Sequence, residues 1–188
     1  MKVKVLETCG TEWALFGLSL SYNKLDPDKD IVKLYDLSKK LAKKDGGHNK
    51  FLESIITWID ITASRKWWSQ FDTYRVGVTK QSESTMHTLL RDEITQDHFN
   101  SRVKTEYIEW LNHLREDGDI NRLKDALPEG FLQRRIICTN YKTLRTIYQQ
   151  RKHHKLGEWR DFLKMLIAVL PTSGYIDGNY ETSNRKDN

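Results

Sequence analysis

Polar side chains suited to an anionic ligand are concentrated between residues 47 and 87, a segment that reads GHNKFLESIITWIDITASRKWWSQFDTYRVGVTKQSESTMH. Arginine guanidinium groups and serine hydroxyls satisfy phosphate oxygens, because guanidinium forks form charge-assisted pairs and each hydroxyl donates one hydrogen bond. A glutamine amide donates and accepts at once, which suits the edge of a pyrimidine. The polar candidates are His48, Glu53, Ser64, Arg65, Gln70, Tyr74, Arg75, Gln81, Ser82, Ser84 and His87. Their density favours a polar ligand site.

The same residues have a purely structural alternative. Arg65 and Arg75 could pair with Glu53 and Asp72 on a helix surface, which would require no ligand. Both alternatives remain open at this point.

Other chemistries are not indicated. The sequence has no Walker phosphate loop, no glycine fingerprint of a dinucleotide site, no nucleophile elbow and no Cys/His cluster with zinc spacing. We therefore expect no metal site. The adjacent Trp67 and Trp68 could stack on a flat ring, but tryptophans at consecutive helical positions favour packing in the core or at subunit contacts.

Composition limits the class of protein. The 188 residues are 38% hydrophobic and 30% charged with a net charge of +5, a balance typical of a globular protein with a modest core. Basic residues alternate with acidic neighbours and form no nucleic-acid-binding motif, so we expect no nucleic-acid partner. The apolar runs 55–61 and 162–170 are too short to cross a bilayer, and the Met1 end has no signal pattern. We expect a cytoplasmic protein without a membrane contact.

The elements that must position the candidates follow from hydrophobic periodicity. We expect an α/β (α+β) chain with a single domain over residues 1–175 and a flexible tail over 176–188, where Gly, Asn, Ser and charged residues dominate. Strands are predicted at 3–6, in the second part of 51–62, and at 131–139. Helices are predicted at 11–22, from about 30 to the glycines at 46 and 47, in the first part of 51–62, and at 64–71, from 83, 97–115, 120–126, 143–152 and 158–170. A turn is predicted at 26–28 and a loop at 73–81.

Read in order, several segments form a longer pattern. The matching residues of the first half are Gly47, His48, Leu52, Glu53, Ser64, Arg65, Gln70, Arg75 and Ser84. Those of the second half are Leu127, Pro128, Asn140, Lys142, Arg151, Glu158 and Arg160. From about Val3 to Pro171 the chain resembles the flavin-dependent thymidylate synthases, also called thymidylate synthase complementing proteins.

The resemblance implies a fold and an activity. The fold is a mixed sheet flanked by helices, which assembles as a homotetramer whose active sites are shared between subunits. Members convert dUMP to dTMP with methylenetetrahydrofolate as carbon donor, NADPH as reductant and FAD as hydride carrier. The protein would orient the reactants and supply electrostatic stabilisation.

The resemblance also implies residue roles. Arg160 and Ser84 would be catalytic, with Arg160 favouring charge that develops on a uracil oxygen. The dUMP-binding residues would be Gln70, Ser82, Ser84, Arg151 and Arg160. The cofactor-binding positions would be Ser54, Thr73, Tyr74, Arg75, Gln81 and Asn140.

Several departures from the family pattern lie on the cofactor side. Ser54 stands in place of a histidine, Thr73 and Tyr74 replace an Arg-His pair, and Met86 replaces an arginine. Each lost charged hydrogen bond costs about 1.5–3 kcal/mol of binding unless it is replaced. The candidate replacements are Lys80, His87 and Lys142, and the Tyr74 ring could stack on the flavin. Two alternatives therefore remain: a related pyrimidine nucleotide hydroxymethylating enzyme, and a non-catalytic nucleotide- or protein-binding relative that has lost FAD.

Overall fold

The computed structural model describes residues 1–21, 26, 29–44 and 46–180. Parts of the predictions fall outside these residues: the end of the first helix at residue 22, most of the turn at 26–28, and residues 181–188 of the expected tail.

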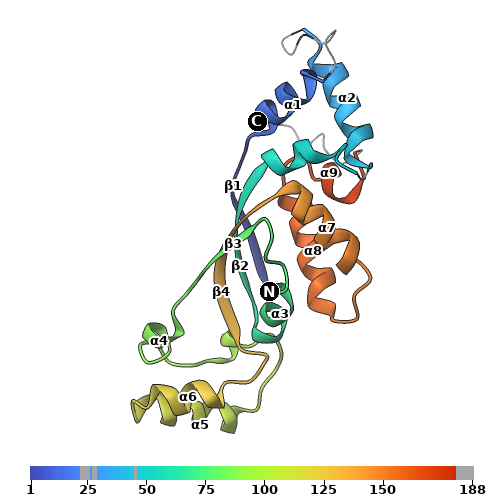
Figure 1. Ribbon diagram of the computed structural model, residues 1–188. Coiled ribbons are helices and arrows are strands. Elements are labelled where there is room, and N and C mark those ends of the chain that lie inside the picture. Colours follow the sequence, from blue (N-terminus) through green and yellow to red (C-terminus); the bar gives the residue numbers. More distant parts are fainter. Residues whose placement is uncertain (22–25, 27–28, 45, 181–188) are drawn as a thin grey trace, which may run out of the picture.

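A four-stranded sheet in the order β1-β2-β4-β3 runs through the molecule (Figure 1). The strands are β1 (Lys2–Cys9), β2 (Ile56–Ser64), β4 (Leu132–Asn140) and β3 (Val78–Ser82). All three pairings are antiparallel. The α+β class is confirmed, whereas the expected mixed sheet is wrong.

The two faces of the sheet differ in burial because side chains alternate along a strand. On one face of β2, Ile59, Ile61 and Ala63 are fully buried. On the other face, Ile56 and Trp58 are only partly buried. Figure 1 places the helices α7 (Tyr141–Arg151) and α8 (Gly157–Val169) on one side of the sheet.

Aromatic side chains fill the space between the sheet and these helices. Trp67 and Trp68, on α3 (Arg65–Phe71), are fully buried and meet edge to face with ring centroids 4.9 Å apart. Trp67 also contacts Trp159 and Phe162 of α8. The prediction that the tryptophan pair packs in the core is confirmed, so neither ring is an open platform for a ligand.

The remaining elements lie at the two ends of the sheet (Figure 1). A second hydrophobic cluster, built around Leu111, Leu123 and Phe131, holds the elements of one end together. That end contains α4 (Thr85–Thr88), the 3₁₀ helix η2 (Gln96–His98), α5 (Thr105–Glu116) and α6 (Ile120–Ala126). The other end contains α1 (Thr11–Ser19), α2 (Ile31–Ala42), the 3₁₀ helix η1 (Lys50–Ser54) and α9 (Gly174–Asp177).

Several boundaries differ from the sequence-based expectation. The loop expected at 73–81 contains β3, whose sequence VTKQS has one apolar residue and is held by backbone pairing to β4. The helix expected at 97–115 begins only at Thr105. The expected start of the tail at residue 176 falls inside α9, where Ile176 is fully buried. Among the described residues, no helix is long and apolar enough to span a membrane.

Substitutions at two glycines, Gly10 and Gly17, can test the packing at the junction between β1 and α1. Gly10 has φ +88°, and a Cβ there would lie 2.3 Å from the backbone oxygen of Ser54. Gly17 lies within helix α1, and a Cβ there would meet no atom within 4 Å. We predict that Gly10→Ala lowers the free energy of unfolding by about 2–4 kcal/mol through backbone strain and steric overlap.

The matched variant Gly17→Ala should instead raise the free energy of unfolding by about 0.5–1 kcal/mol, because alanine is the better helix former. Urea unfolding followed by circular dichroism measures both. Equal effects of the two substitutions would contradict the packing described for Gly10.

Candidate functional site

The candidate site is centred on the indole of Trp159, in the first turn of α8, which is fully buried. Its Nε1–H donates to Oε1 of Gln70 at 2.7 Å. Because an indole nitrogen can only donate, the amide oxygen of Gln70 must face Trp159, and the amide NH₂ group faces away as a donor. The guanidinium of Arg151 lies over the Trp159 ring, 4.8 Å from its centroid.

Interlocking caps fix these elements relative to each other. Ser64 caps α3, since its Oγ accepts from the backbone N–H of Trp67 at 3.2 Å. The same hydroxyl donates to Oε2 of Glu158 at 2.8 Å, at the start of α8. The Glu158 side chain is only 12% exposed and lies 3.6 Å from the Lys66 amine. Ser64 and Glu158 therefore set the register that brings Gln70 to Trp159.

Arg151 ends α7 and is held from a second side by Tyr74. Its Nε donates to the Tyr74 hydroxyl at 2.8 Å, and that hydroxyl donates to Oε1 of Gln150 at 3.0 Å. Among the described residues, no carboxylate forms an ion pair with Arg151 or Arg160. No described carboxylate therefore competes with an anion for the terminal nitrogens of Arg151.

A basic turn, residues 151–155, connects α7 to α8 and reads RKHHK. The ring nitrogen Nδ1 of His154 accepts from the Leu156 N–H at 3.1 Å, and its carbonyl oxygen accepts from Arg160 at 3.0 Å. Arg160 is exposed beside Trp159. The turn therefore places Arg151 and Arg160 at one strongly positive end of the helix pair, which attracts anions.

Most of the expected cofactor-binding positions gather in a groove next to this centre. The groove has a volume of about 800 Å³ and includes Thr73, Tyr74, Arg75 and Asn140 in its lining. Ser54 lines an adjoining groove of about 750 Å³. The side-chain oxygen of Asn140 accepts from the Thr143 N–H at 2.9 Å and caps α7, so it is already occupied.

Glu53 lines both grooves and forms an ion pair with Lys142.

Gln81, Ser82 and Ser84 are separated from Trp159. Gln81 and Ser82 lie on β3, and Ser84 precedes α4 without capping it through its side chain. Figure 1 shows α4 near α5 and α6 at one end of the sheet, away from α7 and α8. No hydrogen bond between described residues joins Ser82 or Ser84 to the Trp159 centre.

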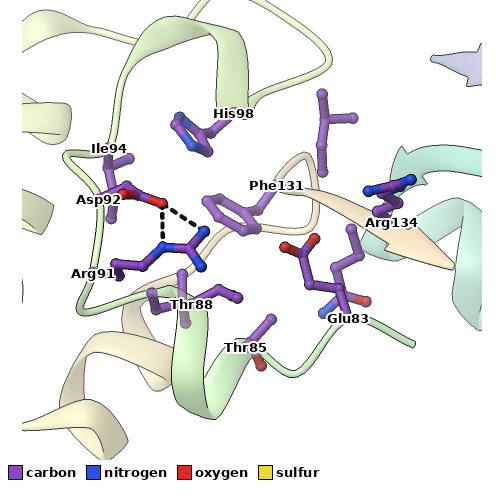
Figure 2. Close-up of a pocket in the computed structure, with 12 residues that line it drawn as sticks. Glu83, Thr85, Thr88, Arg91, Asp92, Ile94, His98, Phe131 and Arg134 are labelled. Atoms are coloured by element: carbon purple, nitrogen blue, oxygen red, sulfur yellow. Dashed lines mark hydrogen bonds and ion pairs between the residues drawn. The ribbon is translucent and has the colours of Figure 1, made fainter. Parts of the chain in front are cut away.

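A small cavity of about 120 Å³ lies beside α4, and none of the expected site residues lines it. Figure 2 shows Glu83, Thr85, His98 and Arg134 around it, with Arg91 and Asp92 paired at 2.8 Å.

Several basic side chains outside the Trp159 centre already have partners within the chain. Asp72 pairs with Lys80 at 2.9 Å and Arg135 at 3.1 Å. Partial burial raises the pKa of Asp72, but the hydrogen bonds and charges of these two cations outweigh burial and hold its pKa below its ordinary value. Arg65 donates to the Leu127 carbonyl at 2.7 Å. Among the described residues neither Arg65 nor Arg75 forms an ion pair with Glu53 or Asp72, so the alternative in which these arginines pair with those carboxylates is wrong.

Sequence reasoning missed Trp159 as the organising residue. It lies between Glu158 and Arg160, both of which matched the family pattern, so the signal was its position rather than its type. The surface-exposed Gln150, which orients the Tyr74 hydroxyl, carries no comparable signal.

The Asp72 pairs predict a pH-dependent contribution to stability. Because the pKa of Asp72 is lowered by folding, its contribution is present above the ordinary value of 3.8 and is lost as the pH falls through the lower folded-state value. We predict that Asp72→Asn lowers the free energy of unfolding by up to about 1 kcal/mol at pH 7. Urea unfolding at pH 7 and pH 3 should show a smaller difference at pH 3.

The exposed Asp161 of α8 forms no ion pair with another described residue, so Asp161→Asn is the control. A pH-independent effect of Asp72→Asn would contradict the assignment.

Comparisons with known proteins bear on the fold. No family model matches the chain, and no curated protein matches it. The solved structures that match include two of the flavin-dependent thymidylate synthase ThyX from Helicobacter pylori with FAD and dUMP. Each is 19% identical, with a TM-score of 0.77 over 93% of this chain and 96% of the other. The chain therefore has the fold of the flavin-dependent thymidylate synthase ThyX.

Proposed function

We propose that this protein is a flavin-dependent thymidylate synthase that converts dUMP to dTMP, with methylenetetrahydrofolate as carbon donor and NADPH as reductant. The observation that carries the proposal is the Arg151 guanidinium, stacked on Trp159 without a carboxylate partner among the described residues, next to the outward NH₂ group of Gln70. The fold supports it, because the Helicobacter pylori ThyX structures contain FAD and dUMP.

The nucleotide-binding role is divided among the basic residues. Arg151 and Gln70 supply donors to the anionic end of the nucleotide, since a guanidinium fork matches phosphate oxygens. Arg160, exposed at the start of α8, is free to reach the pyrimidine and to stabilise negative charge on its oxygen. Ser82 and Ser84, which lie apart from Trp159 within one chain, would supply hydroxyl donors from the β3 edge of another copy of the chain.

The groove lined by Tyr74 and the groove that adjoins it would accommodate a large, flat, anionic cofactor. Their volumes of about 800 and 750 Å³ lie in the range of small-molecule sites. Thr73, Tyr74, Arg75 and Asn140 would hold FAD in the first groove and Ser54 in the second, with Gln81 completing the set from β3. When bound, FAD would supply the hydride that NADPH provides. Arg75 is exposed and offers a cation to the cofactor phosphates.

A non-catalytic nucleotide-binding relative without FAD is the second candidate. Lys80 and Lys142, which could replace the missing cationic residues, are engaged with Asp72 and Glu53. These ion pairs weaken the argument for FAD binding, whereas the argument for nucleotide binding is unchanged. The hydroxymethylating alternative shares the whole pocket and differs only in its product.

A homotetramer is part of the proposal. The sheet face opposite the helices carries Ile56, Trp58, Ile136 and Cys138, all only partly buried. Contact between copies of this chain would cover these apolar side chains. A shared site would also bring Ser82 and Ser84 of one chain to the Trp159 centre of another.

The decisive measurement is the absorbance of the purified protein in the flavin bands, together with tritium release from dUMP labelled at C5. We predict flavin absorbance, tritium release that requires methylenetetrahydrofolate and NADPH, and dTMP as the product by mass. Arg151→Ala should weaken dUMP binding about tenfold to a hundredfold, the cost of losing a charged hydrogen bond.

Arg122→Ala is the matched control, because Arg122 is exposed on α6, away from the site. It should bind dUMP as the unmodified protein does. Colourless protein that binds dUMP but releases no tritium with added FAD would favour the non-catalytic alternative. A hydroxymethylated product would favour the hydroxymethylating alternative.

A further inference from the structure

Tyr74 stands out because it holds a cation without neutralising it. Arg134 pairs with the carboxylate of Asp60 at 2.6 Å, and Arg135 pairs with Asp72 at 3.1 Å. The contact of Arg151 is instead a neutral phenol, at 2.8 Å from its Nε. The guanidinium of Arg151 is therefore held in place without a negatively charged partner among the described residues.

The hydrogen bonds of Tyr74 have a fixed direction. Its hydroxyl has one proton, which it donates to Oε1 of Gln150 at 3.0 Å. The lone pairs of the oxygen are then left to accept from Arg151. A phenylalanine at this position would keep the ring and lose only this acceptor.

Two aromatic rings limit the rotation of the guanidinium. Arg151 lies 4.8 Å from the centroid of Trp159 and 5.5 Å from that of Tyr74. The Nε–H bond to Tyr74 adds an in-plane constraint that stacking alone does not provide. With Nε engaged, the two terminal nitrogens form the side of the fork that remains for a ligand.

We propose that Tyr74 is a positioning residue that fixes the terminal nitrogens of Arg151 toward the phosphate of the bound nucleotide. The proposal rests on the proposed function for the identity of that nucleotide, dUMP. It assigns to the Tyr74 hydroxyl a role at the nucleotide, whereas its ring lines the groove on the cofactor side.

The test compares dUMP, deoxyuridine and inorganic phosphate as ligands in isothermal titration calorimetry. Tyr74→Phe should bind dUMP and phosphate about five- to tenfold more weakly, as expected for one hydrogen bond. Its affinity for deoxyuridine, which has no phosphate, should change less than twofold. A general disturbance of the fold would weaken all three ligands alike.

Two further variants sharpen the test. Tyr148→Phe removes a hydroxyl one turn earlier on α7, outside the Arg151 contacts, and should leave all three affinities unchanged. In an Arg151→Ala background, Tyr74→Phe should have no further effect on dUMP binding, because the hydroxyl acts through Arg151.

The outcomes separate the two proposals. If the unmodified protein binds dUMP and Tyr74→Phe binds it equally well, the positioning role is overturned while the proposed function stands. If the protein binds phosphate but not dUMP, and Tyr74→Phe weakens phosphate binding, the role of Tyr74 is supported and the dUMP assignment falls. Binding of neither ligand to the unmodified protein overturns both.

Discussion

The buried indole of Trp159 is the contact on which both the core and the candidate site depend. Its ring packs with Trp67, Phe71 and Phe162 and is fully excluded from solvent. Close packing leaves such a ring little freedom to move. The indole N–H donates to Gln70, and the ring face contacts the guanidinium of Arg151. Both polar side chains are therefore held against a side chain that has little freedom to move. The site is thus positioned by the hydrophobic core itself.

The arginines of the chain divide according to their partners. Arg134 forms a two-pronged contact with Asp60, and its hydrogen bonds hold the pKa of that carboxyl below the ordinary value. An arginine in such a pair already has a negative partner, so its attraction for a second anion is weaker. Arg151 and Arg160 instead contact a phenol and a backbone carbonyl, both neutral. Two arginines without a carboxylate partner among the described residues therefore lie together at this end of the α7–α8 pair.

The sequence predicted the parts of the fold whose signals are hydrophobic. β2 and β4 have β-branched runs, α8 has an apolar stripe, and all three were found close to their expected limits. β3 was missed because an edge strand with one apolar residue is held by backbone hydrogen bonds, which side-chain type does not report. The expectation of a mixed sheet came from the family resemblance, and hydrophobic periodicity could not correct it, because periodicity does not encode the relative direction of strands.

The sequence predicted which residue types would form the site, but it did not predict which side chains would contact one another. Gln70 and Arg151 were expected to act on one ligand, and the structure brings both to Trp159. Ser64 was a candidate for ligand binding, but the structure shows it buried as a helix cap bound to Glu158. Sequence gives the chemistry that a side chain can perform, whereas its neighbours decide whether that capacity is already used.

Tyr74 shows how a substitution on one side of a site can act on the other. Its ring lines the groove proposed for the cofactor, and its hydroxyl holds the arginine proposed for the nucleotide. A histidine at this position would present ring nitrogens that lie closer to the backbone than the phenol oxygen of Tyr74, so its acceptor would occupy a different place. A cofactor that moved the Tyr74 ring would also move the acceptor of Arg151. The two halves of the proposed site therefore share one side chain, which contributes its ring to one half and its hydroxyl to the other.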